Sequence, residues 1–202
     1  MQYVMIDPEC FFSMVFSSIE VYNRETIGFL MGNIRRRIIY KKMENMVACE
    51  MAYPLQTAAR KPTSVTKGNI RAFERTRALI PSLGLLLVGE YHSHPNMEAN
   101  LTKDDVDYIK ERMDQIYKSG ENLIKNYWLE LVISIRQRRY ISRQEVGWSW
   151  SDYRNKARCI VKIDPFLGYD LTIGGYWLYN ENGKIKKSEA TIFIPWVKGY
   201  WS

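Results

Sequence analysis

The 202-residue chain is poor in histidine and cysteine, with two and three residues respectively. The three cysteines lie far apart and form no CxxC pair, which excludes a four-cysteine zinc site and a disulfide scaffold. We expect all three to be buried free thiols. No apolar stretch approaches the roughly 20 residues that a membrane-spanning helix needs. The N-terminus has no basic lead, so we expect no secretory signal and a cytoplasmic protein without a membrane role.

The composition is that of an ordinary soluble domain, with 46% hydrophobic and 25% charged residues. The length fits one domain, or one domain with added segments. The net charge of +7 permits binding to nucleic acid or to an acidic partner but requires neither. The positive charge is the only feature that supports nucleic-acid binding, so we do not expect this function.

Hydrophobic spacing predicts a mixture of helices and strands over the first two thirds of the chain. We expect helices over 8–22, 68–80 and 102–117, and strands over 26–31, 34–42, 47–53, 83–91 and 127–135. Gly32-Asn33 predicts a turn. We expect loops over 54–67 and 92–102.

The C-terminal third gives a weaker signal. Residues 136–158 are basic and contain two tryptophans, and we expect an irregular insertion there. Strands are expected over 158–163, 171–179 and 184–194, with a hairpin turn at Glu181-Asn182-Gly183. We therefore divide the chain into a core over 1–135 and a β-rich extension over 136–202 that packs on the same domain.

Both histidines of the chain lie in one short segment, His92-Ser93-His94-Pro95. At the end of a strand, residues two apart point to the same side, so the two imidazoles project together. Asp105 follows in the first turn of the next helix, and two histidines with a carboxylate form a familiar three-ligand shell for catalytic zinc. The fourth position stays open to water, whose pKa falls to roughly 7 on zinc.

Hydrolysis at such a site also needs a general base. Our candidate is Glu25, which precedes the apolar segment from Thr26 to Gly32. Glu20 and Glu90 are the alternatives, and Glu90 would point with the histidines only if its strand alternates regularly. Spacing alone does not bring Glu25 beside His92.

These residues resemble the JAMM (MPN+) zinc metalloprotease pattern. That pattern is a glutamate before an apolar strand that ends in glycine, then H-x-H-P, six residues, Ser, two residues and Asp. This chain has Glu25, then His92-Ser93-His94-Pro95, six residues, Thr102, two residues and Asp105. The motifs span about residues 20–110, and the general layout extends to about residue 135.

The resemblance implies an α/β (α+β) fold with a curved mixed sheet flanked by helices, of the MPN and cytidine-deaminase type. It implies one Zn²⁺ per chain bound by His92, His94 and Asp105, with Glu25 as the base. Thr102 replaces the family's serine, whose hydroxyl helps to polarise the scissile carbonyl and stabilise the oxyanion. The implied reaction hydrolyses the peptide or isopeptide bond after the C-terminal tail of ubiquitin or a ubiquitin-like modifier, with or without a partner subunit.

Other interpretations remain open at this point. T-x-x-D from Thr102 to Asp105 is also a helix cap that needs no metal. The same chemistry would serve to release or trim a small sulfur-carrier protein, and the same fold serves as a non-catalytic binding scaffold. The modifier tail would lie extended beside a strand, with residues 54–67 and 136–158 bordering its groove. Trp148, Trp150 and Tyr153 belong either to a core or to a platform for a partner.

Overall fold

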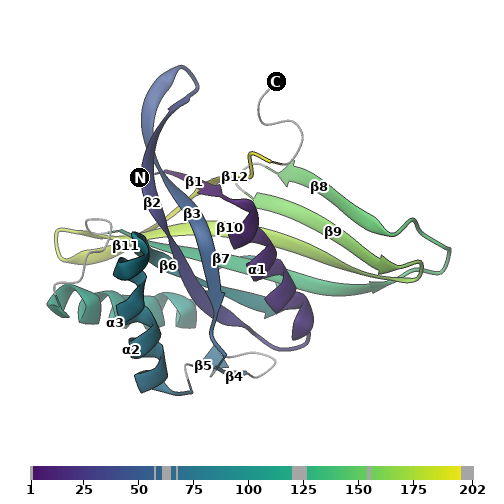
Figure 1. Cartoon of the computed structure of the whole chain (residues 1–202), viewed down its shortest axis with the longest axis horizontal. Helices are drawn as coiled ribbons and strands as arrows, with labels where there is room; N and C mark the ends of the chain where they lie inside the picture. Colours follow the sequence, from purple (N-terminus) through teal and green to yellow (C-terminus); the bar gives the residue numbers. More distant parts are fainter. Residues whose placement is uncertain are drawn as a thin grey trace.

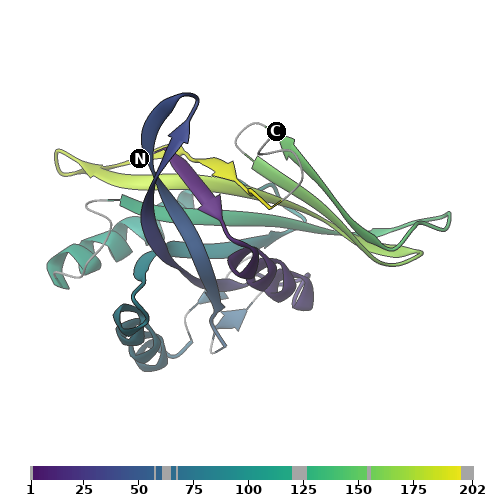
Figure 2. The same cartoon turned by 45° about the horizontal axis from the view of Figure 1, so that its top comes forward.

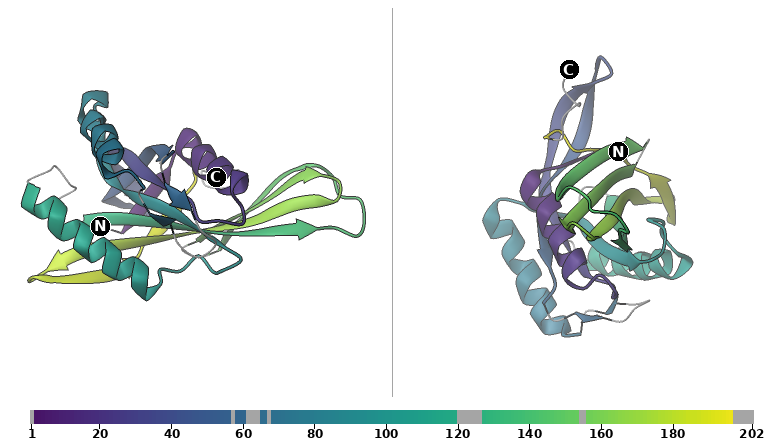
Figure 3. Two further views of the ribbon diagram at one scale, coloured as in Figure 1. Left: turned by 90° about the horizontal axis from the view of Figure 1, so that it is seen from below. Right: turned by 90° about the vertical axis from the view of Figure 1, so that its right-hand side faces the viewer.

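The structure is a computed structural model that describes residues 2–56, 58–60, 65–66, 68–119, 127–153 and 156–196. Its main feature is a curled, mixed ten-stranded sheet, with three α-helices in the described part of the chain (Figure 1). The view along the long axis in Figure 3 shows the curl of the strands. The predicted fold, a curved mixed sheet flanked by helices, is confirmed.

The elements follow one another along the chain in a mixed order. The helices are α1 (Pro8–Glu20), α2 (Ile70–Leu79), the 3₁₀ helix η1 (Ile80–Leu83) and α3 (Lys103–Ser119). The strands of the first two thirds are β1 (Tyr3–Ile6), β2 (Ile27–Ile39), β3 (Lys42–Pro54), β6 (Leu86–Pro95) and β7 (Tyr127–Arg139). The later strands are β8 (Gly147–Tyr153), β9 (Lys156–Asp164), β10 (Leu167–Glu181), β11 (Lys184–Glu189) and β12 (Thr191–Phe193).

The strand order is β12-β1-β3-β2-β6-β7-β10-β9-β8, with β11 paired to β10. Strand β6 is central, antiparallel to β2 and parallel to β7. This position explains why every residue of β6 after Leu86 is buried, because a central strand is covered on both faces. The C-terminal β12 lies parallel to β1, so the two ends of the described chain meet at one edge of the sheet (Figure 2).

Successive side chains of β7 point to opposite faces of the sheet, and they belong to two different hydrophobic cores. Leu129 and Leu131 belong to the cluster that contains Phe11 of α1. Trp128 and Val132 belong to the cluster that contains side chains of both α2 and α3. Helix α1 therefore covers one face of the sheet, and α2 and α3 cover the other.

The predicted turn at Gly32-Asn33 is wrong. Strand β2 continues through a bulge, and Gly32 lies so close to β3 that a Cβ there would be 1.8 Å from the carbonyl oxygen of Ala48. The chain instead reverses at Tyr40-Lys41, where both residues have positive φ. This is the backbone of a two-residue type I′ hairpin. The predicted turn at Asn182-Gly183 has the same backbone signature and is confirmed.

The irregular insertion expected over 136–158 is also wrong. Strand β7 runs on to Arg139, and β8 pairs with β9 from Gly147 to Tyr153. These strands continue the main sheet, and Figure 1 shows them extending together beyond the helices. Trp150 packs edge-on against Phe11 with ring centroids 4.6 Å apart, so it belongs to a core, whereas Trp148 stays 40% exposed. The boundary proposed after residue 135 falls within β7.

The remaining differences are smaller. Strand β6 continues to Pro95, into the segment expected to be a loop. Within 54–67 the structure places β4 (Ala59–Arg60) against β5 (Val65–Thr66), and residues 57, 61–64 and 67 lie outside the described residues. The segment 184–194 forms two strands that are separated at Ala190. All three cysteines are free and buried, as expected. Among the described helices, none combines the length and apolarity needed to cross a bilayer.

The contact between β6 and β7 at Gly89 leads to a first prediction. A Cβ on Gly89 would lie 1.8 Å from the carbonyl oxygen of Leu129, which cannot move without disturbing the pairing. We expect Gly89→Ala to lower the free energy of unfolding by about 3 kcal/mol, as overpacking does, measured by urea denaturation. Val146→Ala, at a site that is 55% exposed, is the control and should change it by less than about 0.5 kcal/mol. An equal effect of the two variants would contradict the close packing of β6.

Candidate metal centre

The centre lies where β6 ends and α3 begins. His92 pairs with Val132 and His94 with Ser134 in the parallel β6–β7 ladder, so both histidines share the sheet face that α3 covers. Both side chains are buried. Asp105 comes from the first turn of α3 and reaches both rings.

The three side chains converge with the spacing of metal ligands. The Nε2 atoms of His92 and His94 are 3.0 Å apart. One Asp105 oxygen lies 3.6 Å from the His92 Nε2, and the other lies 3.6 Å from the His94 Nε2. Two ligand atoms on a tetrahedral zinc, each about 2.05 Å from the ion, are about 3.3 Å apart. The donor set and its spacing therefore fit zinc.

The outer ring nitrogens support the same interpretation. His94 Nδ1 lies 3.2 Å from the carbonyl oxygen of Glu98. A carbonyl only accepts, so Nδ1 carries the proton, and in the neutral ring Nε2 then presents a lone pair. His92 Nδ1 likewise lies 2.7 Å from a carboxylate oxygen of Glu130. Two lone pairs facing each other at 3.0 Å require a proton or a cation between them.

Glu130 is a functional candidate that the sequence analysis missed. It is buried in β7, accepts a hydrogen bond from Trp128 Nε1 at 3.2 Å and fixes the ring of His92. Metal-ligating histidines almost always donate their second nitrogen in this way. The available signal was an acidic residue within the apolar strand 127–135, a position that needs a buried partner.

Thr102 and Asp105 form a reciprocal helix cap. The Thr102 backbone N–H and hydroxyl each donate to Asp105 Oδ2 at 2.7 Å, and the Asp105 N–H donates to Thr102 Oγ1 at 3.2 Å. The Asp105 carboxylate therefore serves both in the helix cap and as a candidate metal ligand. Thr102 orients Asp105, and its role at an oxyanion stays a prediction.

The pairing of β2 with β6 brings Glu25 to the histidines. The Thr26 N–H donates to Ser93 Oγ at 2.9 Å, and the Ser93 N–H donates to the Thr26 carbonyl at 2.9 Å. Glu25, next to Thr26, is buried and interacts electrostatically with both histidines and with Asp105. The structure therefore gathers all five predicted residues in one place.

The alternative bases are placed differently. Glu20 is exposed at the end of α1. Glu90 pairs with Glu130 across β6 and β7, so it does share the face of the histidines, and it is buried. Its charge raises the pKa of Glu130, which places it on the Glu130 side of the centre.

The buried charges of the centre shift one another's pKa values. Burial would lower the pKa of His92, but the nearby Asp105 carboxylate and the hydrogen bond with the Glu130 carboxylate raise it to about 10. Burial opposes ionisation of Asp105, yet the neighbouring imidazoles of His92 and His94 hold its pKa well below its usual range. Without a metal, His92 therefore carries a proton at neutral pH.

The two remaining carboxyl groups shift upward. Burial raises the pKa of Glu130 to about 7, against the lowering effect of the His92 hydrogen bond. Burial also raises the pKa of Glu25 above its ordinary value, while the charges of the histidines oppose this. A carboxyl group with a raised pKa exchanges protons more readily near neutral pH.

Comparison with known proteins assigns the chain to a family. The family described as prokaryotic homologues of the JAB domain matches residues 11–150. The chain belongs to this family. The match confirms the predicted resemblance to JAMM (MPN+) proteins and extends beyond residue 135, into β8. A search of curated proteins gave no match.

A solved structure is also similar to this JAB-domain protein. It is the solution structure of a protein from Desulfitobacterium hafniense, with 14% sequence identity and a TM-score of 0.47. The alignment covers 95% of this chain and 93% of that one.

The charges around His92 predict its titration in the metal-free JAB-domain protein. Its folded-state pKa of about 10 lies above the ordinary 6.5. The ion pairs therefore contribute fully to stability below about pH 6.5, and their contribution is lost as the pH rises through about 10. Nuclear magnetic resonance of ¹⁵N-labelled imidazole, in chelator-treated protein, should show His92 protonated at pH 8. In Glu130→Gln the pKa should fall; an ordinary titration near pH 6.5 in the wild-type protein would contradict this electrostatic picture.

Proposed function

We propose that this JAB-domain protein is a zinc-dependent hydrolase of peptide or isopeptide bonds. The observation that carries the proposal is the convergence of His92, His94 and Asp105 at 3.0–3.6 Å beside the buried Glu25. The family includes zinc isopeptidases, which supports the same reaction class. The substrate that we propose is the C-terminal tail of ubiquitin or a ubiquitin-like protein.

The ion would be held by the Nε2 atoms of the two histidines and by the Asp105 carboxylate. When bound, zinc supplies a Lewis acid that lowers the pKa of a water molecule to about 7 and polarises a carbonyl. His92 gives up its Nε2 proton on metal binding, because a ligating imidazole must be neutral on that nitrogen. Glu130 and the Glu98 carbonyl keep both rings in the ligating orientation.

Glu25 is the residue that moves protons in this proposal. Its carboxylate accepts a proton from the attacking water and later delivers it to the leaving amine. The raised pKa of Glu25 suits both steps, since a base with a pKa closer to the working pH holds and releases a proton efficiently. The Thr26–Ser93 hydrogen bonds hold Glu25 beside the ligands, so it needs no rearrangement to act.

Glu25→Gln tests this assignment. The amide keeps the size of the side chain but cannot accept the proton, so we expect one zinc per chain to remain while hydrolysis falls by about 10²–10⁴-fold. Metal content is measured by mass spectrometry, and hydrolysis with modifier conjugates and tail peptides. The double variant His92→Ala, His94→Ala should lose both metal and activity, and Glu20→Gln is the matched control that should keep both.

The outcomes separate the alternatives. A fully active Glu25→Gln protein would overturn the role of Glu25. Cleavage of a sulfur-carrier precursor, but of no modifier conjugate, would move the substrate to that class. If the wild-type protein takes up no metal when zinc is supplied, the hydrolase proposal fails and a non-catalytic binding scaffold becomes the favoured function.

Thr102 gives an independent prediction. If its hydroxyl turns from Asp105 to donate to the oxyanion, while the Thr102 backbone N–H keeps its hydrogen bond to Asp105, Thr102→Ser should keep most of the rate and the cap. Thr102→Ala should lower the free energy of unfolding by about 1 kcal/mol through loss of the cap and lower kcat by about 10²-fold or more. Thermal unfolding and steady-state kinetics measure the two effects. A loss of stability in Thr102→Ala with an unchanged kcat would restrict Thr102 to the cap.

A further inference from the structure

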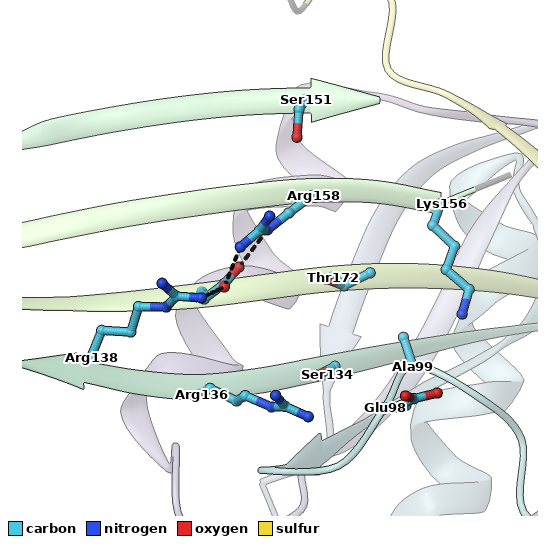
Figure 4. Close-up of a pocket in the computed structure, with 10 residues that line it drawn as sticks. Glu98, Ala99, Ser134, Arg136, Arg138, Ser151, Lys156, Arg158 and Thr172 are labelled. Atoms are coloured by element: carbon cyan, nitrogen blue, oxygen red, sulfur yellow. Dashed lines mark hydrogen bonds and ion pairs between the residues drawn. The ribbon is translucent and has the colours of Figure 1, made fainter. Parts of the chain in front are cut away.

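A basic groove lies on the sheet beside the metal centre. It has a volume of about 600 Å³ and is formed mainly by side chains of β7, β9 and β10 (Figure 4). That volume is within the range of about 300–1,000 Å³ that is usual for ligand sites. Its charged lining residues are Glu98, Arg136, Arg138, Lys156, Arg158 and Asp170.

The strand register places this groove in line with the metal ligands. His94 pairs with Ser134, Ser134 with Thr172, and Thr172 with Arg158. Paired residues share a face, so His94 and Arg158 belong to one row across the sheet. With neighbouring strands about 4.8 Å apart, their Cα atoms are separated by about 14 Å. Arg136 is nearer, one strand over and two residues further along, at about 8 Å.

Asp170 holds two of the arginines in fixed positions. Arg158 donates to it through Nε and a terminal nitrogen at 2.9 and 2.6 Å, and Arg138 donates at 2.5 Å. Each guanidinium has five N–H groups, so both retain donors for another acceptor. One carboxylate thus fixes two cations and leaves the groove positively charged.

Arg136 is the cation most available to a ligand. It is exposed, and within the described part of the chain its side chain forms no hydrogen bond or ion pair. Figure 4 shows its guanidinium along the groove floor, on the side of Ser134. The other two arginines of the groove, Arg138 and Arg158, are held on Asp170 instead.

The segment 96–101 separates the groove from the metal centre and contacts both. The Glu98 carbonyl faces His94 Nδ1, while the Glu98 side chain lines the groove. Ser134 on the groove floor donates to the Met97 carbonyl at 2.5 Å, and Lys156 donates to Asn100 at 2.8 Å. A ligand in the groove would therefore touch the segment that orients a metal ligand.

We propose that the groove binds an acidic segment of the polypeptide substrate, with a carboxylate against Arg136. This inference rests on the proposed function. An extended peptide advances about 3.3 Å per residue, so the 8–14 Å between the Cα atoms of His94 and the arginines sets a minimum of about two to four residues, and a peptide that passes around the segment 96–101 needs more. The carboxylate would accordingly lie about four or more residues from the bond that is cut, and Arg136 acts as a positioning residue.

The lining favours a peptide over a nucleic acid. Among the described residues that form the groove, none is aromatic, so bases would lack a stacking surface. Glu98 and Asp170 would also repel a continuous phosphate backbone, whereas a single carboxylate can approach the arginines between them.

The first test measures binding without depending on hydrolysis. Fluorescent Gly/Ser peptides that carry four Asp, four Gln or four Lys residues are titrated against zinc-loaded and metal-free protein, and anisotropy gives Kd. We expect the Asp peptide to bind at least tenfold more tightly than the Gln peptide. Arg136→Glu should remove this preference. Arg139→Glu is the matched control, because it makes the same charge change at an exposed position on the other face of β7.

The second test links the groove to the cut bond. In a peptide library, substrates with Asp about four or more residues from the cleavage site should have a KM about tenfold below that of their Gln counterparts. Arg136→Glu should remove this advantage and transfer it to Lys-containing peptides, with kcat changed less than KM.

The outcomes distinguish this inference from the proposed function. Asp-peptide binding that requires Arg136, without hydrolysis of any peptide or conjugate, would support the groove and overturn the proposed function. Hydrolysis with the same KM for Asp and Gln substrates, unchanged in Arg136→Glu, would support the proposed function and overturn the groove proposal. Tighter binding of an oligothymidine than of the Asp peptide, lost equally in Arg136→Glu, would overturn the groove proposal in favour of nucleic acid.

Discussion

The pairing of β6 with β2 on one side and β7 on the other is the constraint on which the rest of the site depends. It sets which side chains of β6 face α3 and which face α1. A slip of one residue would turn His92 and His94 to the opposite face of the sheet. Both imidazoles would then point into the apolar core under α1, away from Asp105. The hydrogen bonds between Thr26 and Ser93 place the neighbouring Glu25 beside the histidines. The pairing of His92 with Val132 places Glu130, two residues before Val132 on the same face of β7, beside the ring of His92. One register thus places residues from three separate parts of the chain.

The same register brings charged side chains together in a buried part of the sheet. Three carboxylates and two imidazoles lie together, and burying such groups is unfavourable unless each has a partner. A proton on His92 supplies part of the compensation in the metal-free protein. A divalent cation would supply more, because it neutralises the carboxylates without adding a donor that must itself be satisfied. The centre is therefore built around a positive charge, and its own residues are too acidic to provide it all.

Sequence alone identified the parts of the site that lie close together in the chain. His92, His94 and Asp105 follow from the alternation of a strand and the first turn of a helix, whereas the place of Thr102 in the site came from the family resemblance. Glu25 required the family resemblance, because only a long-range strand pair brings it to the histidines. Glu130 was missed for the same reason, since its partner is on another strand. In β8, the alternation Trp148-Ser149-Trp150-Ser151 marks a strand with one apolar face, but the basic residues before it obscured the pattern. The hairpin at Tyr40-Lys41 carries neither Asn nor Gly and gave no local signal.

The parallel pairing of β12 with β1 has a consequence for how the chain folds. Trp196 donates to the Ile6 carbonyl across 190 residues of sequence, and Thr191 pairs with Tyr3 in the same edge. Contacts this distant in sequence carry the largest loop-closure entropy, and they form slowly. During synthesis β1 can find β3 early, but its outer edge stays open until β12 has left the ribosome. Until β12 arrives, the nascent chain therefore exposes an unpaired strand edge at β1, the kind of surface that favours aggregation or chaperone binding.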